Sequence, residues 1–215
     1  MNLRLRADLL RKLRDFFHAR GFLEVETPLL SADTVIDRHL DPFSVHVGAD
    51  PSGPDPAYWL QTSPEFAMKR LLAAGAEAVY QVTRAFRQGE LGPLHNPEFT
   101  IVEWYRPGDD MTGGMQLLGD LCDELLKLGP ARRISYREAF QLYAGIDPHA
   151  SDTPGIRAAA ESCDICIPVG IRDDDRDGWL DLLLSERVGP RLGIDRPTIV
   201  FDYPAGQAAL ARVRD

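Results

Sequence analysis

The sequence has no long hydrophobic run, few cysteines and no excess of positive charge. No stretch approaches the roughly 18 consecutive apolar residues that a membrane-spanning helix requires. The first residues lead into an amphipathic pattern without the apolar segment of a signal peptide. We therefore expect a soluble cytoplasmic protein without a membrane partner.

The three cysteines, Cys122, Cys163 and Cys166, cannot all pair with one another. One Cys-x-x-Cys without a second pair or clustered histidines is a weak indication of a zinc or redox site, so we interpret them as buried thiols or as part of a helix face. The net charge of −9 provides no cluster of Lys and Arg for phosphate-backbone binding. This charge disfavours a tRNA partner, although a local basic patch stays open.

A central pair of β-rich runs, 79–87 and 98–105, organises the chain. A loop containing glycine and proline joins them, which predicts an antiparallel strand pair around a ligand. With 215 residues and 44% hydrophobic content, the chain can bury one core, and we expect one domain with room for a small appendage.

Helical spacing of apolar residues predicts a helix over about 4–20, capped at its C-terminal end by Gly21. Residues 22–27 then alternate like a strand, with the acids facing one way and the apolar residues the other, and end at Pro28. The segment 31–56 is rich in Asp, Pro and Gly and contains only one possible strand, at 43–47.

The second half of the chain predicts further helices and a last strand. Apolar spacing marks a helix from 115 to 128, and Ser135 to Glu138 is a capping box that opens a short helix ending near Gly145. We read 147–190 as a peripheral helical excursion, in which the charged run 172–177 is a solvated turn rather than a metal site. Further elements expected here are a helix start at Thr153-Pro154, a helix over 179–188, and a buried strand over 198–203 that ends at Pro204.

The segment from Thr62 to Glu65 predicts a helix start, because it combines a hydroxyl cap, proline in the first turn and an acid three residues after Thr62. The helix would run to Ala74 and end at Gly75. Glu65 thus has two interpretations on sequence grounds. It is either the carboxylate of a capping box or a ligand-binding group.

Strand parity places Thr83, Ala85 and Arg87 on one face of the first strand. The second strand presents Phe99, Ile101, Glu103 and Tyr105 on one face. Burying Arg87 and Glu103 without partners would cost several kcal/mol, so this face is too polar for an ordinary core. The alternative is a solvent-facing side of the sheet with one surface ion pair.

Several of these segments resemble motifs of class II aminoacyl-tRNA synthetases. Residues 21–28 are similar to motif 1, the helix and strand of the dimer interface in that class, and 86–100 are similar to the lysyl-type motif 2. The closer resemblance is to the elongation factor P (R)-β-lysine ligase family, stand-alone paralogues of lysyl-tRNA synthetase. It rests on 60–65, 68–75, 103–107 and 203–211.

The resemblance covers the whole chain and implies an α+β fold, with an antiparallel β-sheet flanked by helices and no anticodon-binding domain. Such ligases activate (R)-β-lysine or lysine as an adenylate and transfer it to a lysine of elongation factor P. The resemblance therefore implies ATP as co-substrate, Mg²⁺, and a homodimer with Pro28 near its two-fold axis. No protein nucleophile is needed, so catalysis consists of positioning and charge neutralisation.

The family pattern also assigns site residues. Arg87 matches the motif 2 arginine on the α-phosphate and is the implied catalytic residue, because its fork of donors suits an oxyanion. Phe99 matches the aromatic ring that stacks on adenine. The other implied ATP contacts are Gln88, Gly89, Glu90, His95 and Asn96. The implied amino-acid pocket, in which carboxylates and a phenol pair with ammonium groups, consists of Ser63, Pro64, Glu65, Glu103 and Tyr105. This favours the ligand interpretation of Glu65, which can still cap its helix.

Two departures from the family pattern stand out. Gly89 occupies the position of the motif 2 acid that reads the adenine amino group, so either Glu90 takes this role through a shifted loop or adenine recognition is weakened. Residues 192–196 superficially resemble motif 3. We reject this match because Pro197 and a strand pattern follow where motif 3 needs a long apolar helix, and because it precedes 203–211, the wrong order for the family.

We expect the 215-residue chain to stop before the segment that carries the motif 3 arginine. On that basis it should bind ATP weakly and show little lysine-dependent pyrophosphate exchange by itself. Two alternatives stay open. One is a lysyl-tRNA synthetase-like enzyme, which the acidic charge and the missing anticodon domain disfavour. The other is a non-catalytic remnant that binds nucleotide or dimerises, which the length favours.

Overall fold

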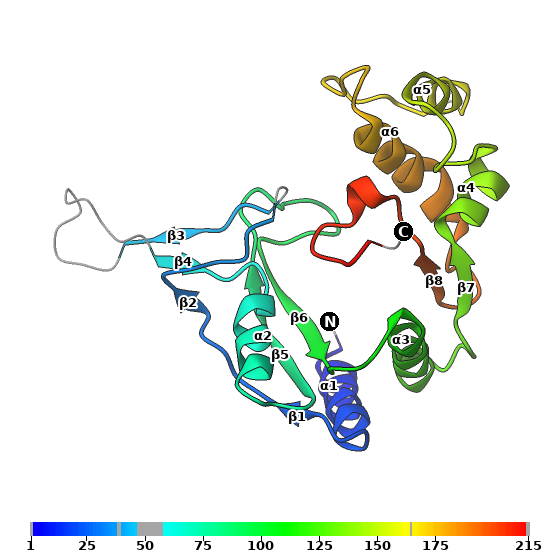
Figure 1. Cartoon of the computed structure of the whole chain (residues 1–215). Coiled ribbons are helices and arrows are strands. Elements are labelled where there is room, and N and C mark those ends of the chain that lie inside the picture. Colours follow the sequence, from blue (N-terminus) through cyan, green and yellow to red (C-terminus); the bar gives the residue numbers. More distant parts are fainter. Residues whose placement is uncertain (1, 38–39, 47–57, 164, 214–215) are drawn as a thin grey trace. The chain divides into compact units, whose positions relative to one another are not determined.

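The computed structural model describes residues 2–37, 40–46, 58–163 and 165–213, and the chain divides into two compact units, 1–110 and 111–215 (Figure 1). In the described part of the chain, no helix has both the length and the apolar character needed to cross a membrane. The two units are described separately below.

The first unit is built on a long antiparallel hairpin, β5 (Val79–Phe86) and β6 (Glu98–Tyr105) (Figure 1). This confirms the predicted central strand pair. The short strand β1 (Leu23–Glu24) adds to β5 in parallel, so the strand order is β1-β5-β6. A smaller antiparallel sheet has the order β2-β4-β3 and consists of β2 (Leu30–Ser31), β4 (Tyr58–Leu60) and β3 (Ser44–Val45).

Helix α1 (Leu3–His18) packs on one face of the hairpin through a cluster of aromatic rings. The buried ring of Phe17 stacks on that of Tyr80, with ring centroids 4.6 Å apart, and meets the rings of Phe22 and Trp104 at 5.2 and 5.4 Å. Burying one such ring stabilises the fold by about 1.5–3 kcal/mol. The predicted apolar stripe of the helix thus covers the Tyr80 face of the sheet.

A polar network joins the same helix to β1 and β5. Arg14 Nε lies 2.9 and 3.1 Å from the two carboxylate oxygens of Glu24, and the Tyr80 hydroxyl donates to Glu24 Oε2 at 3.0 Å. The other contact of that hydroxyl is His18 Nε2, also at 3.0 Å. Burial, followed by the hydrogen bond and charge of Glu24, raises the pKa of Tyr80, so the phenol remains the donor in this network.

The prediction for 22–27 was too long, because only Leu23–Glu24 is a strand. The predicted opposition of acidic and apolar side chains is present at these two residues: the Leu23 side chain is 63% exposed, while Glu24 is turned toward Arg14 and Tyr80. Beyond the strand, the Val25 N–H donates to the Tyr80 carbonyl at 2.9 Å, and the Thr27 hydroxyl donates to Gln81 Oε1 at 3.0 Å.

The predicted strand over 43–47 is confirmed only for Ser44–Val45, and position 47 lies outside the described residues. Sequence reasoning missed β2 and β4, which are two and three residues long. Strands this short carry no period-2 pattern that a sequence could reveal.

The second unit contains helices around a parallel pair of short strands. Its strands β7 (Arg132–Ser135) and β8 (Thr198–Phe201) pair in parallel. Its α-helices are α3 (Met111–Leu126), α4 (Tyr136–Ala144), α5 (Thr153–Ser162) and α6 (Arg176–Leu183). A π-helical turn (Leu184–Val188) and two 3₁₀ turns (Gly189–Arg191 and Ala205–Gln207) complete it. The strand β7 was not predicted, because Arg132 and Arg133 are exposed and break the apolar pattern.

The capping box of α4 is confirmed. Ser135 Oγ accepts from the Glu138 backbone N–H at 3.1 Å, Glu138 Oε2 accepts from the Ser135 backbone at 2.9 Å, and Gly145 ends the helix with φ of +72°. The segment 147–190 contains the helices α5 and α6, but within this unit it is not peripheral, because it contributes to the core the buried side chains of Ile156, Ala160, Trp179, Leu180 and Leu183. A single domain over 1–215 stays a prediction.

We expect Glu24→Gln to destabilise the chain, because the neutral amide loses the ion pair with Arg14 and weakens the bond from Tyr80. The expected loss is about 1–2 kcal/mol in the free energy of unfolding, measured by urea denaturation. The control is Glu26→Gln, an exposed acid two residues further, which should change stability by less than about 0.5 kcal/mol. Equal losses for the two variants would contradict the role of this network.

Candidate functional site

The site lies on the face of the hairpin opposite Tyr80. In the β5–β6 register Gln81 pairs with Glu103, Thr83 with Ile101 and Ala85 with Phe99, and directly opposite residues share a face. The predicted parity is therefore confirmed. The alternative, a solvent-facing side of the sheet with one surface ion pair, fits this face only in part, because Arg87 forms an ion pair with the partly exposed Glu90. Gln81 and Ala85 are buried on this face, and each of the two charged side chains has a different partner.

A loop over 61–65 joins the two parts of the site. Gln61 is buried and fixes the loop to the end of β5: its carbonyl accepts from the Phe86 N–H at 2.9 Å, and its Nε2 donates to the Arg84 carbonyl at 2.7 Å. The next two residues reach in different directions. The Thr62 carbonyl lies 3.4 Å from Arg87 Nε, whereas Ser63 Oγ reaches Glu103.

The first part of the site is an acidic cluster. Ser63 Oγ donates to Glu103 Oε1 at 2.5 Å, and the Tyr105 hydroxyl donates to Glu103 Oε2 at 3.0 Å, so both carboxylate oxygens are oriented. Burial, and then the charges of Glu103 and Glu65, raise the pKa of Tyr105. The phenol therefore stays protonated at neutral pH. Two carboxylates in a partly buried setting favour a cationic ligand such as an ammonium group.

The structure excludes one of the two sequence interpretations of Glu65, the capping box, whereas its role as a ligand-binding group stays a prediction. Helix α2 (Glu65–Ala73) begins at Glu65, so this residue stands too early in the helix to complete a capping box with Thr62. Among the described residues, the buried Thr62 Oγ1 has no hydrogen-bond partner, and Glu65 Oε1 contacts Lys69 Nζ at 2.5 Å. The predicted cap is wrong, because Ser63 Oγ accepts from the Glu65 N–H instead, at 3.1 Å. The predicted helix end near Gly75 is confirmed.

The second part of the site combines a cation with an aromatic ring. The guanidinium carbon of Arg87 lies 5.0 Å from the centroid of the Phe99 ring, and its Nη1 is 3.5 Å from Glu90 Oε1. The side chains of Arg87 and Glu90 are 24% and 29% exposed, so the donors of Arg87 remain reachable from solvent. A partly exposed guanidinium can bind an anionic group, and the neighbouring aromatic ring can stack on a flat ring of the same ligand.

The loop after Arg87 brings only some of the other predicted ATP contacts close to it. Gln88 is tied by its backbone to the Asp41 carbonyl at 2.8 Å. His95 and Asn96 are exposed on the loop, and neither side chain has a hydrogen bond or ion pair with another described residue. The structure thus brings together Arg87, Glu90 and Phe99, whereas among the described residues the His95 backbone pairs with Gly92 and no interaction joins His95 or Asn96 to Arg87.

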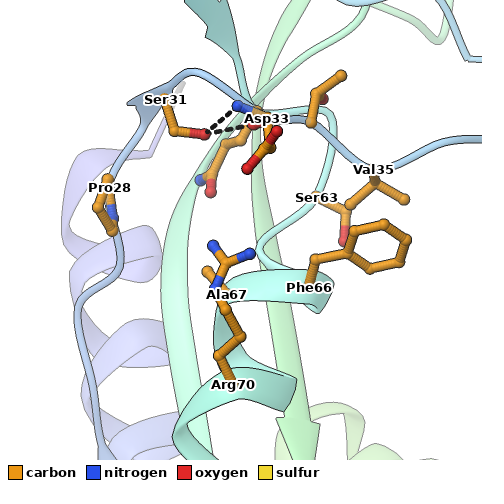
Figure 2. A pocket seen from close by; sticks show the side chains of 10 residues that line it. Pro28, Ser31, Asp33, Val35, Ser63, Phe66, Ala67 and Arg70 are labelled. Atoms are coloured by element: carbon orange, nitrogen blue, oxygen red, sulfur yellow. Dashed lines mark hydrogen bonds between the residues drawn. The ribbon is translucent and has the colours of Figure 1, made fainter.

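A pocket next to the acidic cluster was missed in the sequence. It lies between α2 and the segment 28–35, and Figure 2 shows the side chain of Arg70 extending along α2 toward it. Thr34 Oγ1 is buried there without a hydrogen-bond partner among the described residues. Its lining is Pro28, Ser31, Asp33, Thr34, Val35, Gln61, Ser63, Phe66, Ala67 and Arg70. The pocket shares Gln61 and Ser63 with the site. The spacing of its lining residues in the sequence does not predict a cavity.

The described residues offer no preformed cage for a metal ion, since no group of three or more His, Cys, Asp or Glu side chains is found among them. Mg²⁺ that accompanies ATP is held largely by the phosphates and water. We therefore assign it no protein ligand.

Comparison with known proteins places the chain in a family. The model for tRNA synthetases class II (D, K and N) matches residues 1–215. The chain belongs to this family. It is 43% identical over 212 residues to the elongation factor P–(R)-β-lysine ligases of Salmonella arizonae and Salmonella paratyphi B, and 44% identical over 212 residues to that of Enterobacter sp. strain 638. These matches cover 99% of this chain and 65% of each relative, so the chain spans somewhat less than two thirds of their length.

The family assignment confirms the resemblance drawn from the motifs and the class II synthetase-like α+β fold. The structure also gives a physical reason for the departure at Gly89 in this synthetase-family chain. Gly89 has φ of +83°, a left-handed backbone in which an acidic side chain would be strained. The carboxylate beside Arg87 comes instead from Glu90.

The motif 3 look-alike at 192–196 is a series of bends followed by β8, so the strand that argued against it is confirmed.

We expect Glu103→Gln to lower the pKa of Tyr105 toward its ordinary value of about 10, although burial will keep it above that value. The raised pKa holds the proton on the folded chain when the unfolded chain loses it. The contribution of Tyr105 to the free energy of unfolding is therefore fully present below about pH 10 and is lost as the pH rises further. Because its folded-state pKa is less raised, Glu103→Gln should lose less stability through Tyr105 over this pH range than the unchanged chain. Ultraviolet titration measures the phenol, with Tyr105→Phe to identify its signal.

The control for this titration is Glu98→Gln, on the same strand but the opposite face. It should leave the Tyr105 titration unchanged. A Tyr105 pKa that is the same in Glu103→Gln and in the unchanged chain would contradict the assigned cause.

Proposed function

We propose that this site activates (R)-β-lysine or lysine with ATP and serves the transfer of the acyl group to a lysine of elongation factor P. The observation that carries the proposal is that one sheet face presents a carboxylate cluster and an arginine–aromatic pair. Glu103 and Phe99 are four residues apart on β6, a separation of about 13 Å. This is the scale of an amino acid joined to an adenylate. The printed names of the relatives support the same chemistry.

The first step needs no protein nucleophile. A carboxylate oxygen of the amino acid bonds to the α-phosphorus of ATP, and the bond from that phosphorus to the bridging oxygen breaks, releasing pyrophosphate. In this proposal Arg87 stabilises the negative charge on the α-phosphate oxygens, and Phe99 stacks on adenine. Glu65 and Glu103 pair with the ammonium groups of the substrate, and Tyr105 fixes the second oxygen of Glu103.

In the second step the ε-amine of an acceptor lysine attacks the acyl carbon, the bond from that carbon to the phosphate oxygen breaks, and AMP leaves while the amine loses its proton. We propose a protein acceptor rather than tRNA, because the net charge of −9 opposes a polyanionic partner. The negative net charge is compatible with a substrate that carries ammonium groups. We also propose that the enzyme is cytoplasmic.

We further propose a homodimer built on α1 and β1. Apolar side chains on these two elements are exposed: Leu3 by 66% and Leu5 by 56% at the start of α1, and Leu23 by 63% in β1. Exposed leucines on the elements that match motif 1 support the proposal. The predicted place of Pro28 near the two-fold axis belongs to this proposal.

We expect Arg87→Ala to weaken ATP binding by about tenfold or more, and to lower lysine-dependent pyrophosphate exchange by about 10²–10³-fold, because a charge contact on the reacting phosphate is lost. ATP binding, followed by calorimetry, is the primary measurement. The Salmonella arizonae ligase serves as the positive control for exchange.

The matched control is Arg84→Ala, three residues earlier on the opposite face, which should leave ATP binding within about twofold of the unchanged chain. Turnover that does not depend on Arg87, or equal losses in the two variants, would contradict the proposed site.

We expect Leu23→Glu to shift the chain from dimer to monomer in sedimentation at micromolar concentration, because a charge is placed in the proposed apolar interface. The control is Leu142→Glu, which alters an equally exposed leucine on α4 and should leave the sedimentation coefficient unchanged. A chain that is monomeric before any substitution would refute the interface.

A further inference from the structure

One lysine side chain lies in the acidic cluster without a role in the proposed reaction. Lys69 Nζ contacts Glu65 Oε1 at 2.5 Å and lies 5.9 Å from the centroid of the Tyr105 ring. The chain has three lysines, Lys12, Lys69 and Lys127. In the described part of the chain, Lys69 pairs with Glu65 of the proposed amino-acid pocket, whereas Lys127 pairs with Glu124 in the second unit.

An ordinary pair of helix residues four apart would also put Lys69 near Glu65. Such pairs are normally exposed at both ends and contribute little. This pair differs, because the Glu65 side chain is only 21% exposed whereas that of Lys69 is 47% exposed. The carboxylate is thus enclosed by the site, and the ammonium reaches it from the solvent side on a flexible four-carbon stem.

The position of Lys69 Nζ has a chemical meaning. Its ammonium is the same group as the side-chain ammonium of lysine, and it rests on the carboxylate that the proposed function gives to the substrate. A carboxylate accepts several hydrogen bonds, but two ammonium groups on the same oxygen repel each other. A ligand ammonium that binds at Glu65 Oε1 therefore competes with Lys69 Nζ for that oxygen.

We propose that Lys69 is a positioning residue that occupies Glu65 in the ligand-free chain and yields it to the ammonium group of the substrate. The proposal rests on the proposed function, since it requires Glu65 to bind an ammonium group. Lys69 keeps a partly buried carboxylate paired while the site is empty, which avoids leaving that charge without a partner. The contact between Lys69 and Glu65 also lowers the affinity for substrate, because part of the binding free energy is used to release Lys69 from the carboxylate.

The release is observable directly by NMR of the ¹⁵Nζ resonances, which belong to three lysines only. On titration of the 215-residue chain with L-lysine, the Lys69 resonance should move toward the position that it has in Glu65→Gln. The resonances of Lys12 and Lys127 should remain unchanged. The carboxyl ¹³C resonances of Glu65 and Glu103 report in the same experiment whether lysine binds at the site.

Variants measure the effect on affinity. Lys69→Met keeps the stem and removes the charge, so it should bind L-lysine about threefold more tightly at low ionic strength, and the gain should shrink as salt screens the charges. Lys69→Arg retains a cation and should bind like the unchanged chain. In the Glu65→Gln background, Lys69→Met should produce no further change, because both act through the same carboxylate.

Lys127→Met is the matched control, since Lys127 also pairs with a carboxylate on its own helix, Glu124 at 3.1 Å, but lies in the second unit. It should not alter lysine affinity. Urea denaturation of each variant separates a change in folding from a change in binding.

The outcomes separate the two proposals. If the Glu65 and Glu103 resonances respond to lysine while Lys69 Nζ does not, or if Lys69→Met weakens binding, the displacement is refuted and the proposed function stands. If neither carboxylate responds at any lysine concentration, both the proposed function of this pocket and the role of Lys69 are refuted.

Discussion

The register of the β5–β6 hairpin is the constraint on which the rest of the first unit depends. Eight consecutive pairs, from Val79 with Tyr105 to Phe86 with Glu98, decide which side chains share a face. One face carries Tyr80 and receives α1, and the other carries Phe99 and Glu103. A slip of one residue would exchange the two faces and place the acid against the aromatic cluster, where its burial would cost several kcal/mol. The pairing therefore fixes the core and the site together.

The loop over 61–65 turns this face into a site. Its buried Gln61 adds side-chain hydrogen bonds to the backbone bond that it makes with the end of β5, which satisfies polar groups that would otherwise be buried without partners. From that anchor, Thr62 offers its carbonyl to Arg87 and Ser63 its hydroxyl to Glu103. One short segment thus contacts both Arg87, which we propose to bind phosphate, and Glu103, which we propose to bind an ammonium group, and the following helix supplies Glu65 and Lys69.

The confirmed predictions were those in which local chemistry and burial agree. The hairpin, the apolar stripe of α1 and the capping box at Ser135 each follow from a pattern within a few residues. The failures occurred where a distant partner decides. Thr62 does not cap α2 because that helix begins only at Glu65, and β7 forms because β8 lies beside it. The pocket behind Ser63 likewise depends on two segments that are separate in the sequence.

By itself, the sequence determined the family, the central strand pair and the identity of the residues that face the site, because motif spacing and strand parity are local properties. Only the tertiary structure decided which charges meet. Arg87 pairs with Glu90 and not with Glu103, Glu103 is held by Ser63 and Tyr105, and Glu65 is held by Lys69. Ion pairs and hydrogen bonds act over a few ångströms, so they depend on distances that folding alone establishes.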